Sequence, residues 1–255
     1  METRIMTFNL RYENEIDIVN SWKNRRKFVV DIISEINPEI LGTQEALCPQ
    51  IKYLNSRLLD YNSFIVEHNN ENYVKSPIVF YKKSEFELIS GQNFPLRELK
   101  EDKLKLKTSI KNSKFASLVK LKNYKTGKLF CVINSHFDSK SIENRKLQAE
   151  IIYRWISKQK LPIILIGDFN DTPDSIIYKT LQLNTKLKDT WREMKYKEDA
   201  ESYTFHGFTG IPKRGRLDWI FVDPSIRTVK SEIIKMHSND IFPSDHFPYV
   251  VDLKM

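Results

Sequence analysis

A continuous hydrophobic run lies at 161–166 and ends on a polar pair. Its sequence is Leu-Pro-Ile-Ile-Leu-Ile, and Gly167-Asp168-Phe169-Asn170 follows directly. An apolar run bounded by breakers is typical of a strand that is buried on both faces. Asp168 and Asn170 are two residues apart, so in an extended chain their side chains point to the same side. Taken alone, the pattern fits equally a turn that favours Asp and Asn and an active site at a strand end.

Helical periodicity appears in four other places. Between Ser21 and Ile36 apolar residues recur every three to four positions, which predicts an amphipathic helix that stops at Asn37-Pro38. Further helices are expected at about 50–59, 143–158 and 174–181, and a long polar loop then runs to Tyr203. Strands are expected at 4–10, 40–45, 64–67, 77–82, 86–89, 116–121, 129–136, 163–168, 216–222, 229–236 and 247–253.

The alternation of strands and helices recurs in both halves of the chain. It suits two sheets packed face to face with helices outside, which is an α/β architecture. No linker rich in Gly, Pro and Ser divides the 255 residues, so we expect 1–255 to form a single domain.

Composition narrows the class of protein. The chain is 40% hydrophobic and 12% aromatic, which excludes global disorder. Its first residues lack the apolar region of a secretory signal, and no apolar run approaches the ~18 residues of a membrane span. Cys48 and Cys131 give neither a disulfide framework nor a metal-site spacing. We therefore expect a cytoplasmic protein without a membrane span, whose cysteines are small buried residues.

The net charge of +8 is concentrated in one segment. Ten lysines against Glu101 and Asp102 give 100–128 a net charge of 10 − 2 = +8, so the rest of the chain is about neutral. Within it, residues 103–107 alternate Lys and Leu as a solvated edge strand does, with lysines that discourage edge-to-edge pairing. A surface that binds nucleic acid or steers phosphate is the alternative interpretation.

Six segments place polar or ionisable groups at predicted strand ends. Together they supply carboxylates, carboxamides and two histidines, without a Gly-rich phosphate loop. Oxygen-rich ligands suit Mg²⁺ or Mn²⁺, and a divalent cation would relieve the repulsion within a carboxylate cluster. Enzymes that transfer or hydrolyse phosphoryl groups use such carboxylates, carboxamides and histidines together with a divalent cation. The segments are 8–10 (Phe-Asn-Leu), 44–46 (Gln-Glu-Ala), 134–138 (Asn-Ser-His-Phe-Asp), 167–170 (Gly-Asp-Phe-Asn), 216–220 (Arg-Leu-Asp-Trp-Ile) and 244–248 (Ser-Asp-His-Phe-Pro).

In this order and context, the six segments resemble the motifs of the endonuclease/exonuclease/phosphatase superfamily. The resemblance runs from Asn9 to His246. Residues 22–26 (Trp-Lys-Asn-Arg-Arg), 203–208 (Tyr-Thr-Phe-His-Gly-Phe) and Arg145 with Gln148-Ala149 are similar to a bacterial branch of metal-dependent hydrolases. The fold that the resemblance implies is a four-layered α/β sandwich with two mainly antiparallel or mixed sheets.

The resemblance also implies roles. Glu45 would bind the catalytic Mg²⁺ or Mn²⁺, with Asn9 and Asp245 close to the same ion. Asp168 would orient or deprotonate the attacking water, and Asn170 would help to place water and phosphate. His136 would donate to the phosphate, and His246, held by Asp218, would contact the phosphate or serve as acid or base. Whether Asp168 or the Asp218–His246 pair is the general base stays open.

Several residues keep two interpretations. Asp138 is either a partner of the site or a turn residue, and Arg145 and His206 either bind substrate or brace the cleft. Trp22, Arg25 and Arg26 are interpreted as helix-packing and surface residues. His68 and His237 are interpreted as structural or solvated.

The loops at 67–72 and 93–97 depart from the bacterial branch, which carries a Gly/Arg-rich loop and a Trp-Leu-Ser element there. The expected function is therefore a metal-dependent phosphoesterase acting by direct attack of water, with a small phosphodiester or phosphomonoester favoured as substrate. A DNA or RNA nuclease, endonuclease or exonuclease, is the alternative on the same fold. An inactive family member that binds a phosphorylated ligand or partner is the alternative from another class.

Overall fold

Two six-stranded sheets form the centre of the computed structural model, which describes residues 2–65, 77–97, 114–238 and 241–255. Both sheets are mixed, with parallel pairing of β1 with β2 and of β7 with β8 and antiparallel pairing between the other neighbours. The first sheet has the order β11 (Arg227–Ile233), β12 (Tyr249–Lys254), β1 (Glu2–Asn9), β2 (Ile40–Gln44), β4 (Ile78–Lys82) and β3 (Tyr61–Phe64). The second has the order β5 (Phe86–Pro95), β6 (Phe115–Asn123), β7 (Leu129–His136), β8 (Ile163–Asp168), β10 (Asp218–Val222) and β9 (Lys188–Asp189).

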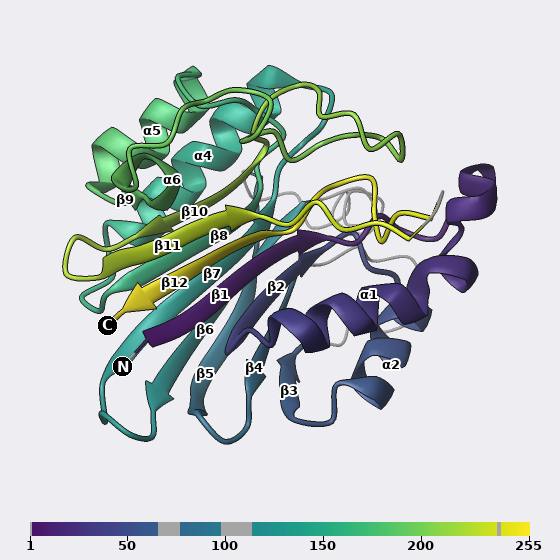
Figure 1. Cartoon of the computed structure of the whole chain (residues 1–255). Coiled ribbons are helices and arrows are strands. Elements are labelled where there is room, and N and C mark those ends of the chain that lie inside the picture. The colour runs from purple at the N-terminus through teal and green to yellow at the C-terminus, as the bar shows by residue number, and fades with distance from the viewer. Residues whose placement is uncertain (1, 66–76, 98–113, 239–240) are drawn as a thin grey trace, which may run out of the picture.

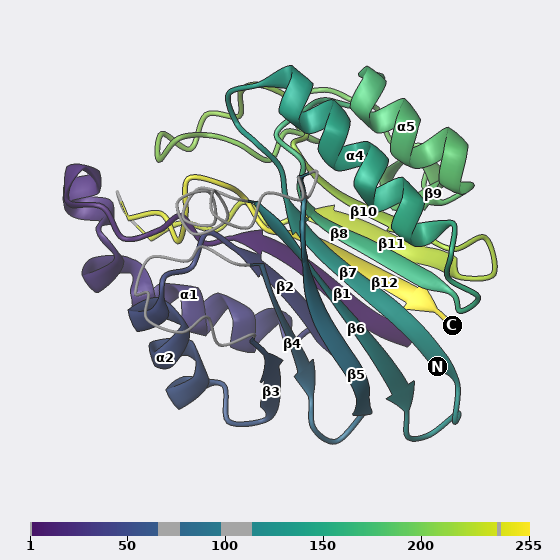
Figure 2. The same cartoon turned by 180° about the vertical axis from the view of Figure 1, so that it is seen from behind.

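Helices cover the outer face of each sheet, as Figures 1 and 2 show from opposite sides. The result is the expected four-layered α/β sandwich. The helices α1 (Trp22–Ile36) and α2 (Cys48–Arg57) lie on the first sheet, and α4 (Ile142–Ile156) and α5 (Ile176–Thr185) lie on the second. The short η1 (Glu15–Asn20) precedes α1, and the short α6 (Thr190–Glu193) contributes Trp191 to the cluster between the sheets.

Three hydrophobic clusters correspond to the three interfaces between layers. The middle cluster fills the space between the sheets and includes Ile5, Val132 and Ile164, each fully buried. The outer clusters join α1 and α2 to the first sheet and α4 and α5 to the second. Burying each large apolar side chain contributes roughly 1.5–3 kcal/mol, so these layers hold the strand ends rigidly.

The structure moves several predicted boundaries. The predicted loop that ends at Tyr203 contains α6, because the Asp189 side chain accepts a hydrogen bond from Trp191 N and Trp191 is buried. The strand predicted at 86–89 continues to Pro95 through a β-bulge between Leu88 and Ser90. The strand predicted at 64–67 is observed at Tyr61–Phe64. Residues 103–107 and His68 lie outside the described residues.

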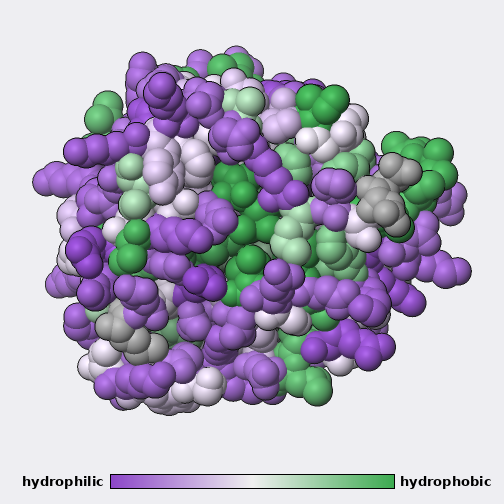
Figure 3. Space-filling view, viewed as in Figure 1, coloured by the Kyte–Doolittle hydropathy of each residue, from purple (hydrophilic) through white to green (hydrophobic). Residues whose placement is uncertain are grey.

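The surface is mainly hydrophilic in the view of Figure 3. Apolar side chains nevertheless gather near the centre of that view. Ile16, Ile18 and Val19 of η1 are also exposed, at 74%, 73% and 54%. In the part of the chain that the structure describes, no helix has the length and apolar character needed to cross a membrane. Cys131 is buried as expected, whereas Cys48 is half-buried.

Candidate functional site

The carboxyl ends of four strands lie at the same rim of the sandwich. Asn9 ends β1 opposite Gln44 of β2, and His136 ends β7 opposite Asp168 of β8. Strand β10 runs the other way and begins at this rim, with Asp218 paired to Asp168. Parallel pairing thus places Asn9 beside Gln44 in the first sheet and His136 beside Asp168 in the second, and the packing of the two sheets brings both pairs to one rim.

Asp168 is at the centre of this rim and is only 1% exposed. Its Oδ2 atom accepts a 2.8 Å hydrogen bond from Asn9 Nδ2, which crosses from the first sheet to the second. Its Oδ1 atom accepts from the backbone N–H of Asn170 at 2.9 Å. Asn170 has φ 50°, and its Nδ2 donates to Phe137 O at 3.1 Å. The carboxylate is thus oriented by both neighbours.

Gly167 makes this close approach of β7 and β8 feasible. Its φ is +147°, and a Cβ atom placed there would lie 2.0 Å from the carbonyl oxygen of Ser135. Any other residue would push the two strands apart and displace Asp168 from His136.

Glu45 and His136 face each other across the two sheets. Glu45 directly follows β2 in a left-handed conformation, with φ 65°, and its Oε2 accepts from Tyr12 N at 3.3 Å. His136 Nε2 lies 3.7 Å from Glu45 Oε1 and 3.7 Å from Asp168 Oδ2. The imidazole of His136 therefore lies between the two carboxylates.

Asp218 and His246 form a buried pair. Asp218 Oδ2 and His246 Nδ1 are 2.8 Å apart, and His246 Nε2 lies 3.8 Å from Asp168 Oδ2. Burial lowers the pKa of His246, but the negative charges of Asp218 and Asp168 outweigh it and raise that pKa to about 10. The pair fixes the orientation of the imidazole and holds it beside Asp168.

Burial and neighbouring carboxylates raise the pKa of Asp168 and of Asp245. Burial raises the pKa of Asp168 to about 7; His246 acts against this change, and the charge of Asp218 adds to it. Burial also raises the pKa of Asp245, where His246 opposes the rise and Glu45 adds to it. A carboxylate cluster of this kind is stabilised when positive charge enters it.

The donor set fits a hard divalent cation. Asn9, Glu45 and Asp245 offer oxygen atoms, the ligand type that Mg²⁺ and Mn²⁺ favour. Asp218 Oδ1 is buried, and no residue described by the structure hydrogen-bonds to it. One ligand atom from each of Asp168, Asp218 and His246 also lies within 4.8 Å of the others, although Asp218 already engages His246.

Other predicted residues lie beside this cluster. The Oδ1 atom of Asp138 accepts from Lys140 N and Ser141 N, which is the arrangement of a turn before α4. Arg145 Nε binds Asp171 Oδ2 at 2.9 Å, and Arg145 Nη1 donates to Asp138 O at 3.1 Å. These contacts brace the loops after β7 and β8.

His206 lies behind the segment that carries Asp245 and His246. Its ring stacks on Phe247 with centroids 4.0 Å apart, and its backbone N–H donates to Asp245 O at 2.9 Å. The Nδ1 atom accepts from Gly210 N at 3.2 Å, and burial lowers the pKa of His206 to about 3. The contacts of His206 thus support the segment that carries Asp245.

The interpretation of Trp22, Arg25 and Arg26 as helix-packing and surface residues agrees with the structure, which buries Arg25 completely and leaves Arg26 exposed. The guanidinium of Arg25 donates to the carbonyl oxygens of Leu10, Arg11, Asn20 and Pro243 at 2.6–2.8 Å. It thereby joins the segments that follow Asn9 and precede Asp245. The helical spacing indicates this burial, because Arg25 lies three positions after Trp22 and four before Val29 on the buried face.

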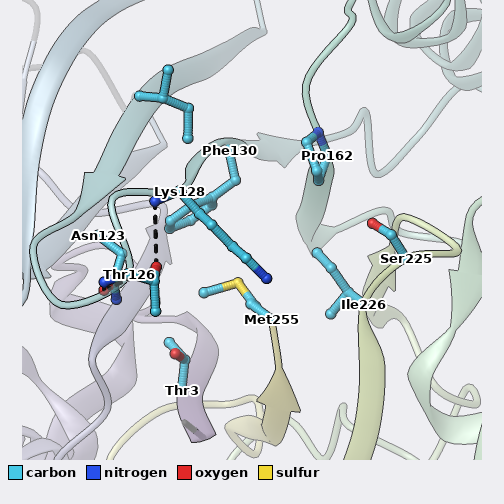
Figure 4. A pocket seen from close by; sticks show the side chains of 10 residues that line it. Thr3, Asn123, Thr126, Lys128, Phe130, Pro162, Ser225, Ile226 and Met255 are labelled. Carbon is cyan, nitrogen blue, oxygen red and sulfur yellow. Dashed lines mark hydrogen bonds between the residues drawn. The ribbon is translucent and has the colours of Figure 1, made fainter.

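A pocket of about 100 Å³ lies at the opposite end of the sandwich (Figure 4). Its lining includes Pro162, which precedes β8, whereas Asp168 ends that strand. Thr3, Lys128 and Met255 also line it, and no carboxylate does among the described residues. The predicted polar residues therefore lie at the other rim.

Comparison with known proteins agrees with this arrangement. The sequence profile of the Endonuclease/Exonuclease/phosphatase family matches residues 6–246. An endonuclease/exonuclease/phosphatase from Bacteroides vulgatus is 30% identical, with a TM-score of 0.86, and the match covers 100% of this chain and 99% of that one. A mannosyl-6-phosphatase of Bacteroides thetaiotaomicron shares the fold, with 24% identity, a TM-score of 0.85 and coverage of 99% and 100%. Rat nocturnin is 25% identical over 91% of this chain, which spans 58% of the nocturnin sequence.

Proposed function

This chain belongs to the endonuclease/exonuclease/phosphatase family, and from that premise we propose that it is a divalent-metal-dependent phosphoesterase. Water attacks phosphorus directly and displaces the alcohol, so no covalent enzyme intermediate forms. The observation that carries the proposal is the 2.8 Å contact of Asn9 with Asp168, which unites the acidic groups of the two sheets in one buried cluster.

Glu45 holds the ion in this proposal, with Asn9 and Asp245 as its neighbours. Mg²⁺ or Mn²⁺, when bound, polarises a phosphate oxygen and offsets the negative charge that accumulates there. The carboxylates of Glu45 and Asp245 influence each other electrostatically. A cation held by these residues would reduce that repulsion.

Asp168 orients the attacking water and accepts its proton. Its carboxylate is well placed for this role because Asn9 and the backbone of Asn170 hold it from two sides. His136 donates a hydrogen bond to a phosphate oxygen, and Asn170 helps to place the water and the phosphate. Groups fixed in advance in this way stabilise developing charge without reorganisation.

His246 contacts the phosphate from the other side. Its Nδ1 atom is engaged by Asp218, which leaves Nε2 on the side of Asp168. The alternative is that the Asp218–His246 pair takes the proton from water. In that case Asp168→Asn retains much of the activity, whereas a loss of at least about 100-fold in Asp168→Asn supports Asp168 as the base.

A small phosphoester is the favoured substrate. Outside residues 100–128 the chain is nearly neutral, so an extended surface for a nucleic-acid backbone is not evident from its charge. The similar fold of a mannosyl-6-phosphatase supports a compact phosphorylated substrate. The ten lysines of 100–128 favour a nuclease as the second candidate.

The test is hydrolysis of bis-p-nitrophenyl phosphate with Mn²⁺, and again after addition of a chelator. We expect a metal-dependent rate that falls by at least about 100-fold in Asp168→Asn and in His246→Ala. Asp31→Asn is the matched control, since Asp31 is an exposed carboxylate on α1 that pairs with Lys27. Activity that ignores the chelator, or survives both substitutions, contradicts the proposal.

Substrate class is decided by a screen of small phosphoesters and of single- and double-stranded oligonucleotides at 50 and 200 mM salt. A nuclease that contacts 6–10 phosphates loses roughly 10³–10⁵ in affinity over that range, whereas a small-ester enzyme loses far less. Ligand binding without hydrolysis of any ester would identify an inactive binding protein.

A further inference from the structure

Lys114 stands directly before β6 and reaches the catalytic rim. Its backbone is held in the second sheet, because Lys114 O accepts from Leu96 N at 2.8 Å and the next residue, Phe115, pairs with Pro95. Its Nζ atom lies 3.2 Å from each ring nitrogen of His136. The antiparallel register, with Ala116 opposite Ser135, is what brings the amine to the end of β7.

The amine is an added positive charge among the acidic groups. Burial lowers the pKa of Lys114, and the charges of Glu45, Asp168 and Asp138 offset this change only in part. Glu45 and Asp168 are also the carboxylates 3.7 Å from His136. Lys114 forms no ion pair with any carboxylate of the described residues. An amine placed in this way is available to an anion that enters beside His136.

We infer that Lys114 binds a non-bridging oxygen of the scissile phosphate and that it selects a terminal phosphate group, so that the substrate is a phosphomonoester. The inference rests on the proposed function, in which His136 donates to the same phosphate. Because Nζ lies within hydrogen-bond distance of the His136 ring, one phosphate group can contact both side chains.

Charge explains the selection. A terminal phosphate carries about −1.5 to −2 at pH 7, whereas the phosphate of a diester carries a single negative charge. Lys114 places a positive charge beside His136, where the nearby carboxylates of Glu45 and Asp168 otherwise repel a dianion. Removing the lysine should therefore penalise the monoester more than the diester.

Lys114 transfers no proton in this reaction, and the bonds and protons of the hydrolysis are accounted for without it. One P–O bond forms to the oxygen of water and one P–O bond to the ester oxygen breaks. Asp168 takes one proton of the water and releases it to solvent, the leaving alkoxide takes up a proton from solvent, and inorganic phosphate retains the second proton of the water. Lys114 therefore acts as a specificity determinant through its charge, and it is the same group before and after the reaction.

The experiment compares p-nitrophenyl phosphate and bis-p-nitrophenyl phosphate as substrates of the full chain with Mg²⁺. In Lys114→Gln we expect kcat/KM to fall about 100-fold for the monoester and less than about 5-fold for the diester, and Lys114→Arg should retain the monoester preference. Lys120→Gln is the matched control, because Lys120 is a half-buried lysine of β6, the strand that Lys114 precedes, and it pairs with Cys131. Its activity should stay within about 2-fold for both esters.

Equal losses for both esters in Lys114→Gln would overturn the assignment of substrate class, and no loss for either would overturn the contact itself. Calorimetric titration with inorganic phosphate in the presence of Mg²⁺ is the second readout. We expect at least tenfold weaker binding to Lys114→Gln than to the wild type or Lys120→Gln, and equal binding contradicts the inference. If the wild type hydrolyses neither ester, the proposed function fails and this titration alone decides the role of Lys114.

Discussion

Asn9 and Asp168 are 159 positions apart in the chain, yet Asn9 Nδ2 donates to Asp168 Oδ2 over 2.8 Å between the two sheets. The hydrogen bond joins the end of β1 to the end of β8. Each residue is held by its own strand, so the contact reports how accurately the two sheets are placed against each other. It also connects the proposed metal ligands with the proposed base.

Asn9→Ala should lower kcat by about 100-fold, because Asp168 then loses one of the two groups that orient it. The stability cost should be about 1–3 kcal/mol, since a buried carboxylate loses a donor. Steady-state kinetics and urea unfolding measure the two effects. Asn55→Ala, an exposed asparagine on α2, is the control and should change neither by much. A fully active Asn9→Ala variant would show that this hydrogen bond is unimportant for the chemistry.

Asp218→Asn should reduce kcat by about 10²–10⁴-fold while the fold persists. The carboxylate accepts from His246 Nδ1 at 2.8 Å, and an amide can reverse the tautomer of the imidazole or turn it away from Asp168. The measurement is kcat at saturating substrate, with circular dichroism as the control for folding. A drop confined to KM would mean that the pair binds substrate without helping the chemical step.

Arg25→Met should destabilise the protein by roughly 3 kcal/mol or more, because four carbonyl oxygens lose their donor at once. Arg26→Met is the neighbouring control, since Arg26 is exposed and its guanidinium lies 4.8 Å from the ring centroid of Tyr53. That contact is worth about 1 kcal/mol at most. Urea unfolding midpoints compare the two variants, and equal midpoints would contradict the role of Arg25 as a brace.

The buried phenol of Tyr178 should make the free energy of unfolding depend on pH in alkaline solution. Burial raises the pKa of its phenol, and the Asp189 carboxylate, which accepts the hydroxyl hydrogen bond at 2.7 Å, raises it further. The folded state holds this proton more tightly than the unfolded chain does. The contribution of Tyr178 is therefore complete below the ordinary pKa near 10 and falls as the pH rises above it, by about 1.4 kcal/mol per pH unit.

Unfolding by denaturant at pH 8, 9, 10 and 11 checks this expectation. The stability advantage of the wild type over Tyr178→Phe should be constant up to about pH 9.5 and should shrink at pH 11. Tyr124→Phe, at a tyrosine that is 54% exposed, should show no such change. A wild-type advantage that grows with pH would have the wrong sign for a raised pKa.

Sequence patterns predicted the elements whose apolar periodicity is strong. The run at 163–168 became β8 with all six residues buried, and the helix expected from Ser21 to Ile36 is α1. The strand ends Asn9, His136 and Asp168 were predicted to be polar groups of one site, and they do converge. Parallel pairing explains this success, because it places the carboxyl ends of neighbouring strands at one rim.

Contacts that depend on tertiary register were beyond the sequence patterns. Lys114 belongs to a lysine-rich segment that reads as a solvated edge, and only the pairing of β6 with β7 places it at His136. Arg25 resembles a surface residue by type, yet its helix position buries it against backbone carbonyls. In both cases the partner lies far along the chain, so no local pattern encodes it.

The most direct test of the central claim is Mn²⁺ binding followed by electron paramagnetic resonance in the wild type and in Glu45→Gln. The claim is that strand ends of both sheets converge on a divalent cation, with Glu45 as its principal ligand. We predict saturable binding by the wild type and at least tenfold weaker binding by Glu45→Gln, whose amide keeps the shape of the side chain but removes its charge. Equal Mn²⁺ affinity in the two proteins would contradict the account.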